Sequence, residues 1–178
     1  MTRRSGLLRR FRRDQRGVAA VEFALIAPVM VLLYCGLVEL CQAMISERKA
    51  NHVASAVGDL VTQAETVSIS DMSDIFSIGS TIMQPFPTTD LAMRVTSITA
   101  GSSGTIVVNW SRSSNWTGSS TPTIPAGMSL AVGDSLIVSE AKYKYTSIIK
   151  AVIPNALNYS EAFYLRPRRS DKVTCTDC

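Results

Sequence analysis

One acidic residue, Glu22, stands in an apolar run that directly follows an arginine-rich stretch. A carboxylate inside a membrane helix costs about 2.5–3.5 kcal/mol near the bilayer centre and less near its end, so this position favours a cationic partner. If the chain is cut between Gly17 and Val18, the new α-amine of Val18 lies one helical turn from Glu22, at a helix end that favours negative charge. The spacing therefore predicts a cleavage that creates a counter-ion for Glu22, within one subunit or between neighbours whose helices it would hold in register.

Glu22 also has a simpler interpretation. A glutamate near the cytoplasmic edge of a membrane helix can extend its carboxylate to the lipid headgroups and needs no partner. The two interpretations differ in whether the mature protein begins at Val18.

The four cysteines fall into two groups with different expected roles. Cys35 and Cys41 lie six residues apart in the apolar part of the chain, and at about 100° per residue they face different directions on a helix, so we expect packing residues that cannot pair. Cys175 and Cys178 form a Cys-Thr-Asp-Cys sequence, for which a small disulfide is favoured over free thiols in an oxidising compartment. Two thiols do not make a structural zinc site, and His52 is remote in sequence, so neither a metal nor a cofactor is expected.

Three segments of different composition must position these residues. Residues 1–17 carry seven arginines and one acid, a basic leader that neither enters a bilayer nor folds. Residues 18–38 are mostly apolar, and their 21 residues match the roughly 20 needed to cross a hydrocarbon core of about 30 Å. Because arginines resist translocation, we expect a cytoplasmic leader, a helix over residues 18–64 that spans the membrane to about residue 40, and an extracytoplasmic domain over residues 65–178.

The charge balance argues against nucleic-acid binding. The whole chain has a formal net charge of +4, but removing the seven arginines and the one aspartate of residues 1–17 leaves −2. The basic excess thus belongs to a topogenic leader rather than to a folded surface. Membrane lipid, not nucleic acid, is the expected partner of this part of the chain.

Other export signals fit the N-terminus less well. A secretory signal peptide would need a small-x-small cleavage site after the apolar run, and the sequence there offers no convincing one. A lipoprotein signal needs small residues before its cysteine, whereas Cys35 follows Tyr34 and Cys41 follows Leu40. A twin-arginine signal fits poorly with so long an apolar segment, and an uncleaved signal anchor leaves Glu22 unexplained.

The N-terminal motif resembles that of a known family. Glycine, four residues and then Glu-Phe follow the leader, with Ala-Pro and Gly-x-x-Glu spacings further on; the residues are Gly17, Glu22, Phe23, Ala27, Pro28, Gly36 and Glu39. This arrangement resembles the TadE-like family of pilin-related proteins of tight-adherence (Tad/Flp, type IVb) pilus systems. The resemblance is strong over about residues 12–56 and only general beyond them.

The resemblance implies a minor pilin or pseudopilin that acts in pilus assembly and surface adherence. It further implies a prepilin peptidase that cuts between Gly17 and Val18, with Glu22 and Phe23 as the processing and assembly motif. The expected partners are that peptidase, other pilins and Tad inner-membrane assembly proteins. The expected location is the bacterial inner membrane, with one span, a cytoplasmic N-terminus and a periplasmic domain, and the cell-surface pilus after assembly. Flp-type major pilins are little more than leader and helix, so about 110 residues after Gln63 argue against the major subunit.

A second function from a different class stays open: a permanently anchored periplasmic scaffold or binding protein of the secretion apparatus. An enzyme is not expected, because one histidine leaves little material for a nucleophile and base, and no phosphate loop, carboxylate pair or metal cluster stands out. No small-molecule substrate is expected either.

The remaining pattern predicts an α+β fold of pilin-like type, a long helical spine carrying a second helix and an antiparallel sheet. Apolar residues at positions 53, 56, 57, 60, 61 and 64 recur at helical spacing and extend the spine beyond the membrane. Ser70 is the expected N-cap of the second helix, which should end by Pro85. Gly36 and Gly58 are expected to be close-packing or flexible points rather than ligand sites.

Period-2 alternation and turn residues predict the strands. The expected strands cover residues 91–100, 105–111, 134–149 and 159–166, with a hairpin turn at residues 101–104. Between the second and third of them, residues 112–133 form a Ser/Thr/Gly/Pro-rich loop that is longer than a routine connection. Trp116 in this loop is either an exposed contact for another component or part of a merely mobile loop beside a packed Trp110. Glu39 is expected either to make a second charged contact at the outer membrane interface or, as the favoured alternative, to mark the place where the helix meets water.

Overall fold

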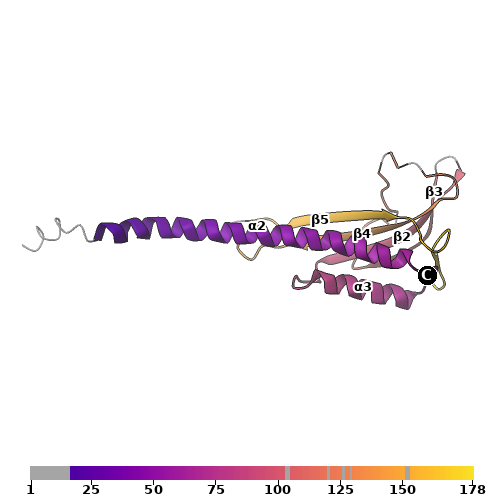
Figure 1. The fold of residues 1–178 in the computed structure, drawn as a ribbon, viewed down its shortest axis with the longest axis horizontal. Helices are drawn as coiled ribbons and strands as arrows, with labels where there is room; N and C mark the ends of the chain where they lie inside the picture. Colours follow the sequence, from indigo (N-terminus) through magenta and orange to yellow (C-terminus); the bar gives the residue numbers. More distant parts are fainter. Residues whose placement is uncertain (1–16, 103–104, 120, 126, 129, 151–152) are drawn as a thin grey trace, which may run out of the picture.

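The computed structural model describes residues 17–178 except 103–104, 120, 126, 129 and 151–152. Residues 1–16, which are all of the expected leader except Gly17, lie outside the described residues. A single helix forms the spine of the molecule, and the domain is packed around its C-terminal half (Figure 1). The expected α+β fold with a long apolar N-terminal helix is confirmed.

The spine is α2, Val18–Thr62, which at 1.5 Å per residue is about 68 Å long. Its N-terminal half is apolar on all sides, whereas its C-terminal half buries one stripe of mostly small residues. Pro28 lies inside α2 without ending it. The buried stripe recurs at intervals of three and four residues, as one face of a helix requires: Glu39, Ala43, Ser46, Ala50, Val53, Ala54, Val57, Gly58, Val61 and Thr62.

A four-stranded antiparallel sheet, in the order β3-β2-β4-β5, packs against this stripe. Its strands are β2 Leu91–Ala100, β3 Ile106–Ser114, β4 Ser135–Tyr145 and β5 Leu157–Leu165. The long predicted strand 134–149 ends earlier, at Tyr145, because the next residues turn towards the helix to contact Glu39. Alternation along β4 follows the prediction, since Tyr143 and Tyr145 are buried while Lys142 and Lys144 are exposed.

The second helix, α3 Ile69–Met83, runs beside α2 and ends before Pro85 as expected. Its N-cap is Ser68 rather than the predicted Ser70. The Ser68 hydroxyl accepts from the Asp71 backbone N–H, and the Asp71 carboxylate accepts from the Ser68 N–H, which is a complete capping box. The Ser68 hydroxyl also donates to the Asp71 carboxylate at 2.7 Å, and this bond, followed by the one from the Ser68 N–H, holds the pKa of Asp71 below its ordinary value.

The main core lies between α2, α3 and the sheet, with Val53, Val57, Met72, Phe76 and Met93 among its side chains. Glycines allow the close approach of these layers. A Cβ on Gly58 would lie 2.7 Å from Leu165 Cδ1 and 2.8 Å from Ser139 Cβ. Gly58 is therefore a close-packing position, which is one of the two roles expected from the sequence.

The outer face of the sheet has a smaller core of its own. Ile98, Leu136 and Val138 are buried there under Ile124 and Leu130. The latter two belong to residues 115–134, so this long connection covers part of the sheet rather than standing free of it. Both faces of the sheet are thus covered at the end furthest from the start of α2.

One pairing was not predicted from the sequence. Thr66–Val67 (β1) and Thr174–Cys175 (β6) form a two-stranded parallel sheet. A strand of two residues is too short to show the alternation of apolar and polar residues by which strands are predicted from a sequence. This pairing ties residues 166–178 back to the turn between the two helices.

Candidate functional site

The N-terminal half of α2 projects from the domain as an apolar rod (Figure 1). Its apolar side chains are exposed, with Phe23 71% exposed and Leu32 63%. The most apolar window has a mean hydropathy of 2.3 and buries nothing within the molecule, and the helix is long enough to cross a membrane. So much exposed apolar surface needs lipid or other apolar helices around it.

Gly17, Val18, Glu22 and Phe23 lie together in the first turns of this rod. Glu22 follows Val18 by four residues, which places the two side chains on the same side of the helix. Within the described part of the chain, Glu22 takes part in no ion pair and no hydrogen bond. No described residue therefore acts as a partner of this carboxylate.

Gly17 is not required by the fold. Its backbone has an ordinary φ of −87°, and a Cβ built on it would meet nothing within 4 Å. Gly58, by contrast, is required by packing. Whatever favours glycine at position 17 must therefore act through something other than the packing of the described residues.

The second carboxylate of α2, Glu39, is in the opposite situation, and the expectation that it meets water is wrong. Its side chain is only 3% exposed. It accepts hydrogen bonds from Tyr145 Oη at 3.0 Å, Ser147 Oγ at 2.7 Å and the Ile149 backbone N–H at 2.9 Å. These three donors belong to the end of β4 and the connection that follows, so Glu39 joins the spine to the sheet where the domain begins.

The bond from Tyr145 to Glu39 alters the acidity of the phenol. Burial, and then the hydrogen bond to the Glu39 carboxylate, raise the pKa of Tyr145 from 10.0 to about 12. Tyr145 therefore stays a neutral donor to Glu39 at any physiological pH. The signal in the sequence was the position of Glu39 four residues before Ala43, at the head of the stripe of small residues.

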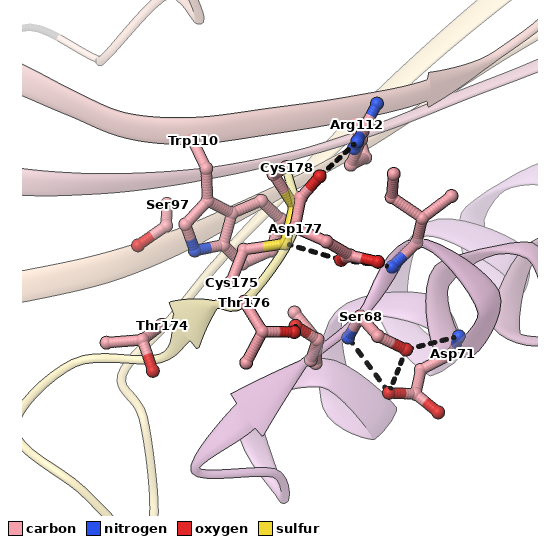
Figure 2. Close-up of a disulfide and its surroundings, with 12 residues drawn as sticks. Ser68, Asp71, Ser97, Trp110, Arg112, Thr174, Cys175, Thr176, Asp177 and Cys178 are labelled. Carbon is pink, nitrogen blue, oxygen red and sulfur yellow. Dashed lines mark hydrogen bonds between the residues drawn. A yellow bond between two sulfur atoms is a disulfide. The ribbon is translucent and has the colours of Figure 1, made fainter.

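The C-terminal cysteines lie at the other end of the molecule from Glu22. Cys175 and Cys178 form a disulfide, with their Cα atoms 5.6 Å apart. Figure 2 shows this disulfide beside Trp110 and above the start of α3. The Asp177 carboxylate accepts from the Ile69 N–H at 2.8 Å, and so adds a second cap to the N-terminus of α3.

Cys175, Asp177 and Cys178 bring possible metal-ligand atoms within 4.8 Å of one another. With the two sulfurs bonded to each other and the carboxylate engaged at a helix N-terminus, these residues fit a structural clasp better than a metal site. The remaining cysteines, Cys35 and Cys41, are free and lie on α2.

Trp116 is half-buried rather than exposed, so the predicted exposed contact is wrong, whereas the packed Trp110 of the alternative prediction is confirmed. The Trp116 ring lies 4.5 Å from the Arg94 guanidinium and 4.1 Å from Lys142 Nζ, which is a cation–π arrangement. Arg94 is also paired with Glu140 at 2.6 Å. Trp110, the other tryptophan, is buried and donates to the Val173 carbonyl at 2.9 Å. Both tryptophans thus serve packing.

The comparison with protein families concerns the spine. Residues 17–59 match the family model described as TadE-like protein. The match starts at Gly17 and runs through both carboxylates into the buried half of α2, and it confirms over these residues the resemblance read from the sequence. No curated protein and no solved structure matches the chain. The match and the apolar helix together suggest a Tad pilus-associated protein with a single-pass membrane anchor.

Proposed function

We propose that this chain is a minor pilin or pseudopilin of a Tad (Flp, type IVb) pilus. A prepilin peptidase cuts it between Gly17 and Val18, and the mature helix then enters pilus assembly and contributes to surface adherence. In this proposal the chain is the substrate of an enzyme and not an enzyme itself. The observation that carries it is Glu22, a carboxylate on an exposed apolar helix for which the described fold provides no partner.

Cleavage would supply the missing partner. It would create a cationic α-amine at Val18, one turn from Glu22 in the same helix or within reach of Glu22 on a neighbouring helix. In an apolar surrounding, such an ion pair is strong enough to fix the axial register of packed helices, because an unpaired carboxylate is costly there. The TadE-like match, which begins at Gly17, supports the same boundary.

The proposal places the N-terminus in the cytoplasm and the domain in the periplasm of the bacterial inner membrane. The arginines of residues 1–16 support this orientation, since basic flanks are retained on the cytoplasmic side. The disulfide between Cys175 and Cys178 suits an oxidising compartment. The expected partners of the protein are the peptidase, other pilins and Tad assembly proteins of the inner membrane.

Substitution of Gly17 tests the processing step. We expect Gly17→Leu, co-expressed with a prepilin peptidase, to keep residues 1–17, because a bulky side chain blocks the scissile bond. Gly17→Ala is the matched control and should still be shortened. The mass of the purified protein separates the two products, and a circular dichroism melt should show the same domain stability for both variants. Normal shortening of Gly17→Leu would contradict the proposed site.

A further inference from the structure

The connection after β4 is fixed to the spine at one level. Ser147 and Ile149 both bond to the Glu39 carboxylate, at 2.7 and 2.9 Å, and Ile148 lies between them. Residues 146–150 are therefore held beside the helix at the position where the buried stripe begins. In Figure 1 this connection lies at the end of the domain that faces the N-terminal half of α2.

Ile148 points away from the protein. It is 89% exposed, the largest exposed fraction among the large apolar side chains of the described residues. Pro85, Phe86 and Pro87 lie close by and, with Ile148 and Tyr143, line a mainly apolar hollow of about 310 Å³. A single exposed isoleucine is common on protein surfaces and needs no explanation. Several apolar side chains gathered at the end of the domain nearest the apolar half of α2 instead indicate a surface that another molecule covers.

The position of Glu39 indicates what covers it. Residues 18–38 have the length of a bilayer's hydrocarbon core, so Glu39 marks the outer interface when this segment spans a membrane. Ile148, held at the level of Glu39, then lies in the same interface. Lys144 and Lys150 are exposed on either side of it and suit the phosphates of lipid headgroups.

We propose that residues 146–150 are a lipid-binding foot, with Ile148 inserted between the headgroups and Lys150 at their phosphates. Insertion to a depth of about 5–10 Å is typical of interfacial apolar groups. The foot and α2 give the domain two attachments to the bilayer instead of one, which restricts its swing about the helix. The inference requires residues 18–38 to span a bilayer, and does not require cleavage at Gly17.

Fluorescence of introduced tryptophans in the full chain tests the foot. Ile148→Trp is placed in lipid nanodiscs of phosphatidylcholine and phosphatidylglycerol whose chains carry bromine either near the headgroup or near the chain end. The parent protein, with Trp110 and Trp116, gives the baseline. We expect a blue-shifted emission from position 148 and quenching that is stronger with bromine near the headgroup.

Two controls use other exposed apolar positions. Val132→Trp replaces a side chain that is 72% exposed beside Gly133, whose N–H bonds to Ala100 at the far end of β2, and its quenching should not exceed the baseline. Leu32→Trp lies within the span and should be quenched by the deep bromines. Quenching of Trp at position 32 with none at position 148 would overturn the proposal that residues 146–150 bind lipid, while still supporting residues 18–38 as a membrane anchor. A blue shift at 148 without lipid quenching would also overturn it, in favour of a protein partner.

Discussion

The two halves of α2 have opposite relations to the rest of the molecule, and one glutamate in each half, Glu22 and Glu39, shows the difference. Residues 18–38 are exposed, and Glu22 has no partner among the described residues. Residues 39–62 are covered by the sheet and α3, and Glu39 has three donors from the domain. Glu39 is thus satisfied by folding, whereas no described residue satisfies Glu22, for which the proposed partner is the Val18 amine created by cleavage.

The largest expected effect is on assembly. In a strain producing Glu22→Ala, we expect the protein to be cut normally but to be lost from the sheared surface fraction, because the helices would lack the proposed ion pair that sets their register. Immunoblots of membranes and of sheared material measure both steps. Glu47→Ala, an exposed glutamate further along α2, is the control. Normal piliation by Glu22→Ala would remove the register role.

The complementary change is Glu39→Ala, for which we expect a loss of stability rather than a primary loss of processing. Removing the carboxylate leaves the Tyr145 and Ser147 hydroxyls and the Ile149 N–H without their acceptor, at a cost of about 3 kcal/mol in the free energy of unfolding. Denaturant unfolding in detergent, followed by Trp110 fluorescence, measures it. Glu47→Ala should be unchanged; equal stability of the two variants would break the contrast between the two carboxylates.

Two glycines extend the comparison along the helix. Gly58→Ala should lower the free energy of unfolding by about 1 kcal/mol, because a strained contact with Ser139 of about 1–3 kcal/mol outweighs a gain in helix propensity of about 1 kcal/mol. Gly17→Ala should leave domain stability unchanged, since a Cβ there meets nothing. The same denaturant titration measures both. A stabilised Gly58→Ala would show that the sheet yields to the new methyl group.

The smallest effect concerns Tyr145 and alkaline pH. Because its pKa rises from 10.0 in the unfolded chain to about 12 in the fold, the neutral phenol contributes stability that is fully present below pH 10 and is lost as pH rises through about 12. Ultraviolet absorbance of tyrosinate should show one phenol that ionises only near pH 12, and this step should be absent in Tyr145→Phe. In Glu39→Gln its pKa should fall, since the charge of Glu39 is one cause of the rise. An unshifted titration in Glu39→Gln would separate Tyr145 from Glu39.

The sequence predicted what depends on local pattern. The apolar length of residues 18–38, the alternation around Lys142 and Lys144, and the exact span of β2 all follow from period and composition. The cap of α3 was misplaced by two residues because Ser68 and Ser70 are both good caps, and only the contact with Asp71 separates them. Local reasoning locates an element better than its ends.

What the sequence did not predict depends on contacts between distant residues. Glu39 bonds to residues more than 100 positions later, and Trp116 packs over Arg94 and Lys142 from two different strands. No spacing rule relates such partners in a single sequence. The Glu22 motif could be read because its expected partner, the Val18 amine, is only one turn away.

The residue at which the mature protein begins decides whether Glu22 gains the α-amine of Val18 as its counter-ion. N-terminal sequencing of the native protein, taken separately from membranes and from the sheared surface fraction, answers that question. We predict a first residue of Val18 in both fractions, which gives Glu22 its counter-ion and places the processed chain in the pilus. A start at Met1 or Thr2, with the protein found only in membranes, would contradict the account and favour a permanently anchored scaffold.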